Sequence, residues 1–162
     1  IGMLHRVYLL LGSNVGDRLS HFEKALQKMN EQAGAVKKIS SYYETEPWGV
    51  VDQGDYLNAA VYLETSLAPE ELFERLNRIE LEEGRTGKQK YLPRTLDIDI
   101  LFYDDLVHHS ETLSIPHPRL HLRRFVLVPL QEIAPGLVHP EFKMTVTELL
   151  DVCADDKTVK KL

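Results

Sequence analysis

Two aspartates separated by one residue form the most distinctive chemical pattern of this sequence. Asp97 and Asp99 alternate with apolar residues in the segment Leu96–Phe102. On a strand, residues i and i+2 point to the same face, so the two carboxylates would stand side by side, roughly 6.5–7 Å apart at their Cα atoms. Such a pair is more often a solvated strand face, yet Asp is depleted in strands and neighbouring like charges repel. Mg²⁺ offsets that repulsion, because it takes one or two protein carboxylates and completes its shell with water and phosphate oxygens, so the pair indicates a phosphoryl-transfer site.

A cationic segment runs directly into the acidic pair. Four of the eleven residues from Gly84 to Arg94 are Lys or Arg, although the chain has a net charge of −6. A triphosphate needs a metal on one side and guanidinium groups on the other, and this juxtaposition supplies both. The segment is not a P-loop, because Gly87-Lys88 lacks the earlier glycine and the following Ser or Thr. A second cationic group follows between Pro116 and Phe125, where His117 is a candidate phosphate donor.

An amide and several aromatic residues flank a loop near the middle of the chain. Asn58 lies within an otherwise apolar segment, and a buried amide requires hydrogen-bond partners. An amide carries both donors and an acceptor, so it can pair with a heterocycle that presents the reverse pattern. Tyr56 or Trp48 would provide a stacking face, although core packing is the more ordinary role for either ring.

Composition limits the class of protein. With 162 residues, 43% of them hydrophobic and 27% charged, we expect one domain with one core, covering 3–162. We treat Ile1-Gly2 as a remnant that precedes the native start at Met3. The acidic balance disfavours nucleic-acid binding, which depends on a basic face, and no apolar run approaches the ~20 residues of a membrane span. Because the single Cys153 can form no internal disulfide, we expect a cytoplasmic protein.

Hydrophobic periodicity predicts the elements that position these residues. We expect strands at 7–11, 36–46, 56–63 and 95–102, helices at 19–29 and 68–84, a proline-bearing loop at 114–122, and short helical elements at 125–130 and 146–150. The order strand, helix, strand, strand, helix, strand predicts a ferredoxin-like α+β fold of the split βαβ type. In this fold the helices would pack on one face of a mostly antiparallel sheet.

Several ordered motifs resemble one known family, 6-hydroxymethyl-7,8-dihydropterin pyrophosphokinase. The motifs are Gly12-Ser13-Asn14, Tyr43-x-Thr45-x-Pro47-x-Gly49, Asp55-Tyr56-Leu57-Asn58, Glu80-x-x-x-Gly84-Arg85, Pro93-Arg94-Thr95-Leu96-Asp97-Ile98-Asp99 and Pro116-His117-Pro118-Arg119. The resemblance extends over nearly the whole chain, from about Val7 to Leu150. It implies a ferredoxin-like fold, a monomer, and pyrophosphoryl transfer from ATP, with two Mg²⁺ ions, to a hydroxymethyl-dihydropterin in folate biosynthesis. The products would be AMP and the pterin diphosphate.

The resemblance also implies a role for individual residues. Asp97 and Asp99 would bind the metals, and the catalytic residues would be Arg94, Arg123 and His117. ATP would contact Asn77, Glu80, Arg85, Lys88, Arg94, Ile100, His117 and Arg123. The pterin would contact Thr45, Pro47, Trp48, Gly49, Tyr56, Asn58 and Phe125.

Two other classes of protein remain open at this point. A magnesium-dependent nucleotidyltransferase also combines a Gly-Ser turn with an Asp-x-Asp pair, but there the two lie close together, whereas Gly12 and Asp97 are far apart in this sequence. A non-catalytic ferredoxin-like binding module would not turn over ATP. It would also give no reason for these residues to occur together: Asp97, Asp99, Arg94 and His117.

Overall fold

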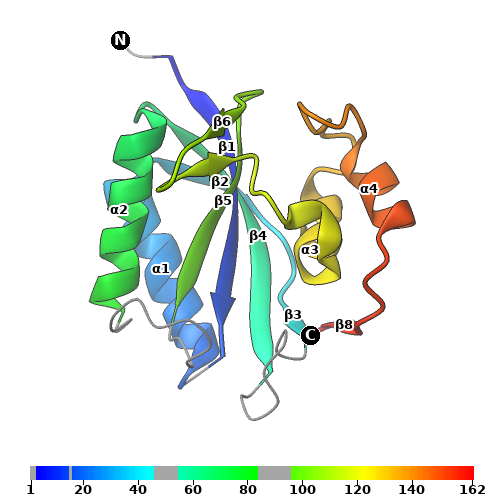
Figure 1. Cartoon of the computed structure of the whole chain (residues 1–162). Helices are drawn as coiled ribbons and strands as arrows, with labels where there is room; N and C mark the ends of the chain where they lie inside the picture. The colour runs from blue at the N-terminus through cyan, green and yellow to red at the C-terminus, as the bar shows by residue number, and fades with distance from the viewer. Residues whose placement is uncertain (1–2, 15, 46–54, 84–95) are drawn as a thin grey trace.

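The fold is built around an antiparallel sheet, seen in a computed structural model that describes residues 3–14, 16–45, 55–83 and 96–162 (Figure 1). Its strands are β1 (His5–Ser13), β2 (Ala35–Ile39), β3 (Tyr43–Thr45), β4 (Tyr56–Thr65), β5 (Asp97–Tyr103) and β8 (Val159–Lys161). Their order is β5-β1-β4-β3-β8, with β2 also paired to β4. The short strands β6 (His108–His109) and β7 (Ser114–Ile115) pair separately. The helices are α1 (Arg18–Gln32), α2 (Pro69–Glu82), α3 (Arg124–Ile133) and α4 (Val146–Val152), with a 3₁₀ turn, η1 (Leu120–Leu122).

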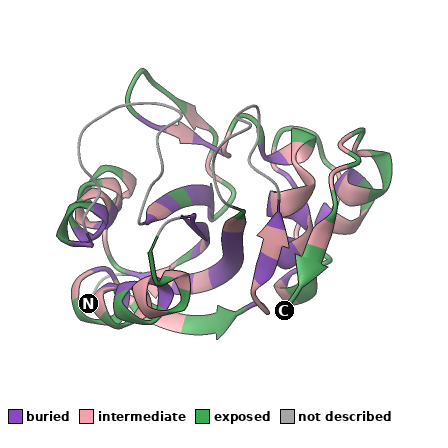
Figure 2. Cartoon of the chain, turned by 90° about the horizontal axis from the view of Figure 1, so that it is seen from below, coloured by how far each residue is buried: buried purple, intermediate pink, exposed green. Residues whose placement is uncertain are grey.

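Strand β1 lies between β5 and β4, and consecutive residues along it are buried, so both of its faces are covered. The central strands of the sheet are largely purple, the colour of buried residues, in Figure 2. Because strand side chains alternate, Leu9 and Leu11 join one hydrophobic cluster while Leu10 joins another. A continuous apolar run is typical of a strand covered on both sides. The predicted buried strand at 7–11 is confirmed.

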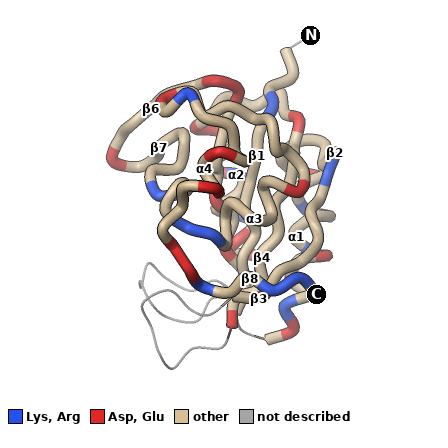
Figure 3. Tube along the Cα trace, turned by 90° about the vertical axis from the view of Figure 1, so that its right-hand side faces the viewer, with Lys and Arg blue, Asp and Glu red and all other residues tan. Residues whose placement is uncertain are grey.

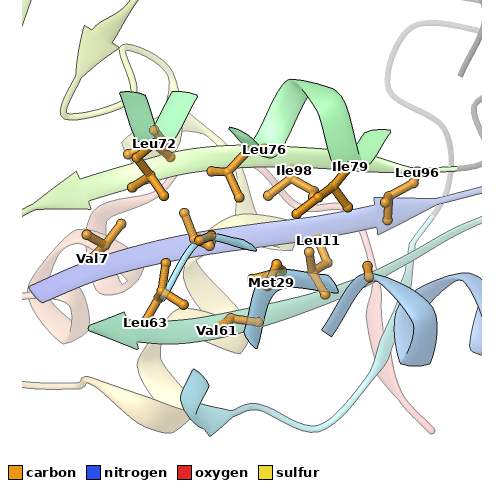
Figure 4. Close-up of a cluster of buried hydrophobic side chains, with 14 of the residues drawn as sticks. Val7, Leu11, Met29, Val61, Leu63, Leu72, Leu76, Ile79, Leu96 and Ile98 are labelled. Atoms are coloured by element: carbon orange, nitrogen blue, oxygen red, sulfur yellow. The ribbon is translucent and has the colours of Figure 1, made fainter. Parts of the chain in front are cut away.

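Helices α1 and α2 cover one face of the sheet (Figures 1 and 4). The side chain of Asp17 caps α1 by accepting a hydrogen bond from the Ser20 amide at 3.1 Å, as the sequence predicts. Pro69 begins α2, and two glutamates follow in its first turn, where the helix dipole favours negative charge. Phe22 and Met29 from α1 and Leu72, Leu76 and Ile79 from α2 pack against β1, β4 and β5.

Helices α3 and α4 cover the opposite face of the sheet (Figure 1). Val126, Leu127 and Leu130 of α3 pack there with Leu10 and Leu101 of the sheet. The expected helical elements and the α+β fold class are confirmed, but the prediction of helices on one face around one core is wrong. Since β1, β4 and β5 are apolar on both faces, a second helical layer is needed to cover the remaining face.

The predicted strand at 36–46 is two strands, β2 and β3, which both pair with β4. Ser40 separates them, because its hydroxyl accepts a hydrogen bond from the Ala60 amide at 2.8 Å and donates one to the Ser41 carbonyl at 2.7 Å. Glu132 of α3 then accepts hydrogen bonds from the Ser41 amide and the Tyr43 hydroxyl, at 2.8 and 2.5 Å. The predicted loop at 114–122 contains β7 and η1, and β8 is an additional strand that pairs with β3.

Lys and Arg are interspersed with Asp and Glu over the described trace (Figure 3). Among the described residues, none of the helices combines the length and apolar character needed to cross a membrane.

Candidate active site

One row of paired residues across the sheet brings together the residues that the sequence singles out. Gly12 of β1 pairs with Asp97 of β5 on one side and with Asn58 of β4 on the other. Asn58 in turn pairs with Tyr43 of β3. Because directly paired residues of antiparallel strands point to the same face, Asp97 and Asn58 share a face on either side of Gly12. Tyr43 reaches Glu132 of α3 from this row, so the shared face is the one that α3 and α4 cover.

The two aspartates lie as their spacing predicts. Asp97 is half-buried and Asp99 is exposed, whereas Leu96, Ile98 and Ile100 are buried in the cluster on the α1 and α2 face. Figure 4 shows Leu96 and Ile98 on that side, beneath α2. The carboxylates therefore point to the α3 face, near the end of the strand where the chain enters the sheet.

The donor set at Asp97 and Asp99 fits Mg²⁺ better than Zn²⁺. Within the described ranges, no group of three or more His, Cys, Asp or Glu side chains gathers to hold a metal. A zinc site needs three or four protein ligands, whereas Mg²⁺ needs only one or two carboxylates and keeps waters and substrate phosphates as its other ligands.

His117 lies beside β5 and carries a neutral imidazole at pH 7. Its amide donates to the Leu101 carbonyl at 3.0 Å, which fixes the chain against the strand. Burial, followed by the charges of Arg123 and Arg119, lowers the pKa of His117 to about 4. The Arg119 amide donates to Nδ1 at 3.2 Å, so Nε2 carries the ring proton and is available as a donor.

Arg123 precedes the first turn of α3 and lies within electrostatic reach of Asp99. Burial and the charge of Arg119 lower the pKa of Arg123, while Asp99 opposes that shift. The guanidinium carbon is 5.6 Å from the centroid of the Phe125 ring, at the distance of a cation–π contact. The start of α3 thus places a cation and an aromatic ring at the acidic end of the sheet.

Asn58 is held by the protein on both ends of its amide and is almost fully buried, at 3% exposure. Its Nδ2 donates to the Leu11 carbonyl at 3.2 Å, and its Oδ1 accepts from the Thr45 hydroxyl at 3.3 Å. A primary amide has two donor hydrogens and two acceptor lone pairs. One donor and one acceptor position therefore remain beyond its bonds to described residues, which matches the amide edge of a heterocycle.

Tyr56 and Phe125, the two rings expected to stack on a ligand, come from different layers. Tyr56 is half-buried on β4, two residues before Asn58 and hence on the same face of the sheet. Phe125 is half-buried on α3, the helix that packs over that face. Whether they enclose a ligand remains a prediction.

Glu80, Ile100 and Asn77 occupy the other side of β5. Glu80 is a buried residue of α2, and its carboxylate accepts a hydrogen bond from the Ile98 amide at 2.8 Å. The Ile98 N–H therefore points away from β1, and because strand amides alternate in direction, the N–H and C=O of Ile100 point the same way. Ile100 itself is buried in the hydrophobic cluster, so only its backbone can face a nucleotide. Asn77 shares the helix face of Glu80, three residues apart.

Six further residues expected at the site lie outside the described residues. They are Pro47, Trp48, Gly49, Arg85, Lys88 and Arg94.

Reasoning from the sequence missed two features of the site. Arg119 stands out there only as one member of a cationic group, although its amide and its charge both act on His117. The motif Pro116-His117-Pro118-Arg119 carries that signal. The position of Gly12 between Asn58 and Asp97 depends on strand register, for which the sequence offers no local signal.

Comparison with known proteins gives consistent matches. Residues 8–135 match a family model described as 7,8-dihydro-6-hydroxymethylpterin-pyrophosphokinase. Curated relatives named 2-amino-4-hydroxy-6-hydroxymethyldihydropteridine pyrophosphokinase include that of Aquifex aeolicus, 44% identical over 142 residues, which cover 88% of each chain. The relative from Haemophilus influenzae is 41% identical over 154 residues, covering 94% of this chain and 96% of that one.

Solved structures give the same match at the level of the fold. The structure of Plasmodium falciparum HPPK-DHPS wild type with SDX-DHP aligns with a TM-score of 0.78 at 18% identity. The aligned region covers 93% of this chain and 44% of the Plasmodium chain. At this identity the likeness concerns the fold alone.

Proposed function

The chain belongs to the 7,8-dihydro-6-hydroxymethylpterin-pyrophosphokinase family, and on this premise we propose that it transfers the pyrophosphoryl group of ATP to 6-hydroxymethyl-7,8-dihydropterin in folate biosynthesis. The hydroxymethyl oxygen attacks the β-phosphorus, the bond from that phosphorus to the α-phosphate oxygen breaks, and the alcohol proton leaves to solvent. The products are AMP and the pterin diphosphate.

The observation that carries this proposal is the row Asp97–Gly12–Asn58. Neighbouring strands are ~4.8 Å apart, so the acidic residue and the amide are separated by about 10 Å across the sheet. A pterin bound at Asn58 can then extend its one-carbon alcohol over β1 toward phosphates held at Asp97. Holding donor and acceptor in line in this way is the main requirement of phosphoryl transfer.

The phosphate side combines carboxylates with cations. Asp97 and Asp99 would hold two Mg²⁺ ions, which would neutralise charge on the phosphates when bound. Arg94 and Arg123 donate to the transferred pyrophosphoryl group, and Arg85 and Lys88 are further contacts to ATP. The neutral imidazole of His117 donates a hydrogen bond from Nε2, a role that its lowered pKa supports.

The nucleotide and pterin lie on different sides of this centre. Asn77 and Glu80 contact the nucleotide from α2, and the outward backbone of Ile100 supports a main-chain contact from the edge strand β5. The pterin stacks between the rings of Tyr56 and Phe125, and Asn58 forms hydrogen bonds with its polar edge. The remaining pterin contacts come from Thr45, Pro47, Trp48 and Gly49.

The same proposal covers the physical state of the protein. Residues 3–162 form one pyrophosphokinase domain that acts as a monomer in the cytoplasm on two small molecules and binds no nucleic acid. The acidic charge of −6 supports the last point.

Purified protein incubated with ATP, Mg²⁺ and the hydroxymethyl-dihydropterin tests this function. A new pterin diphosphate, resolved by anion exchange, is expected only when all three are present. A matched reaction with the 6-methyl analogue, which lacks the acceptor oxygen, should yield none. Equal ATP consumption with and without the hydroxymethyl group would refute the assignment, and transfer of AMP instead would indicate a nucleotidyltransferase.

A further inference from the structure

Gly12 occupies a position of the central strand where glycine is costly and the backbone does not require it. Glycine within a strand loses more conformational entropy on folding than alanine does. Among the described glycines, only Gly16 has a positive φ, of 70°. Gly12 therefore has a backbone conformation that any residue can adopt. A glycine inside a strand commonly marks a place where a ligand or another backbone approaches closely.

The space beside Gly12 is bounded by the two residues that the proposed reaction must connect. A Cβ at position 12 would lie 3.0 Å from Nδ2 of Asn58 and 3.9 Å from Cβ of Asp97. The distance to Asp97 is an ordinary van der Waals contact, whereas the distance to Asn58 requires the amide to move by a few tenths of an ångström. That amide is already held at both ends by Leu11 and Thr45, so moving it strains bonds that orient it.

Two other glycines, Gly34 and Gly136, differ from Gly12 in what a side chain at their position would contact. A Cβ at Gly34 would lie 2.3 Å from the Glu64 carbonyl oxygen, so backbone packing excludes a side chain there. A Cβ at Gly136 would have no heavy atom within 4 Å, so a side chain there is free. Only at Gly12, among these three, does the tightest contact fall on a side chain of the candidate site.

We propose that Gly12 is the specificity-determining position of this site: it leaves open the path over β1 along which the hydroxymethyl arm of the pterin reaches from Asn58 to the phosphates at Asp97. This inference rests on the proposed function and adds a residue that sets which substituents the pterin may carry. Any side chain at position 12 displaces the amide and occupies that path. Binding of ATP with Mg²⁺ is affected little, because the contact with Asp97 remains ordinary.

The test compares Gly12→Ala with Gly136→Ala, which adds the same methyl group in open space. For wild type and both variants we would measure thermal melting and three calorimetric Kd values. The ligands are hydroxymethylpterin, unsubstituted pterin, and a non-hydrolysable ATP analogue with Mg²⁺. For Gly12→Ala we expect melting within a few degrees of wild type and a Kd for hydroxymethylpterin raised at least tenfold. We expect the Kd for the ATP analogue to change less than threefold. The Kd for unsubstituted pterin should rise less than the Kd for hydroxymethylpterin. Gly136→Ala should match wild type throughout.

The outcomes separate this inference from the proposed function. If wild-type protein does not bind hydroxymethylpterin, the proposed function itself fails. If wild type binds it and Gly12→Ala binds it equally well, only the role of Gly12 is refuted. A Gly12→Ala protein that does not fold also overturns the inference, because the glycine would then be required by the sheet rather than by the ligand. If Gly12→Ala weakens the binding of hydroxymethylpterin and unsubstituted pterin equally, the methyl group acts only through Asn58. The proposed path for the hydroxymethyl arm is then refuted.

Discussion

Lowering the pH from 7 to 5 should destabilise the ligand-free protein through His117. Burial, together with Arg123 and Arg119, lowers the pKa of this imidazole to about 4, against about 6.5 in an unfolded chain. Between these values the unfolded state binds a proton that the native state does not. The contribution of His117 to stability is therefore intact above pH ~6.5 and declines as the pH falls toward 4.

The size of the effect follows from the two pKa values. For a single site with these values, the free energy of unfolding falls by about 2 kcal/mol between pH 7 and pH 5. Since the ring is only partly buried, solvent screening reduces this loss to about 1–2 kcal/mol. That is a large share of the 5–15 kcal/mol typical of a domain.

Urea unfolding followed by far-UV circular dichroism at both pH values measures this loss, with His117→Asn as the control. The Asn carbonyl can still accept the hydrogen bond that Nδ1 accepts from the Arg119 amide, but it cannot take up a proton. His139, whose pKa is also lowered, mainly by burial, titrates in both proteins and cancels in the comparison. The wild type should lose about 1–2 kcal/mol more than the variant. Equal losses of unfolding free energy in wild type and variant would refute the lowered pKa of His117.

Substitutions at Asp97, Asp99 and Asn58 test the metal half and the pterin half of the site separately. Asp97→Ala or Asp99→Ala should leave the ligand-free protein folded, as its thermal melting would show, because neighbouring carboxylates repel without metal and are easier to lose for stability than for chemistry. Mg²⁺-dependent activity should be almost abolished, and full activity in either variant would remove the metal assignment. Asn58→Ala should weaken pterin binding about 5- to 150-fold, the equivalent of about 1–3 kcal/mol, with ATP affinity unchanged. Fluorescence of Trp48, the single tryptophan, is the readout, and equal weakening of both ligands would place Asn58 outside the pterin site.

Local pattern was sufficient for the elements whose apolar residues follow one period. The strand at 7–11 and both long helices follow from such periods, and the shared face of Asp97 and Asp99 follows from strand alternation. The β-rich pattern from Ile39 to Tyr43 hid the break at Ser40, because a hydroxyl that bonds the neighbouring strand has no signature in propensity. That pattern alone therefore favoured one strand over two.

The local sequence pattern does not predict how segments that are distant in the chain pack against one another. The apolar run of β1 indicates burial on both faces, but nothing local says that α3 and α4 cover the second face. The same holds for the site, where Asn58 and Asp97 flank Gly12 only because β4 and β5 pair with β1 in one particular register. Register depends on the packing of the whole sheet.

The identity of the nucleotide product tests the central claim most directly, since that claim is the joint transfer of the two outer phosphates of ATP to a pterin alcohol. Anion-exchange separation of a reaction containing purified protein, ATP, Mg²⁺ and 6-hydroxymethyl-7,8-dihydropterin quantifies AMP, ADP and the pterin product together. Attack on the β-phosphorus predicts AMP, formed one for one with the pterin diphosphate and without ADP. Stoichiometric ADP with a pterin monophosphate would contradict the claim and would indicate a kinase that attacks the γ-phosphorus.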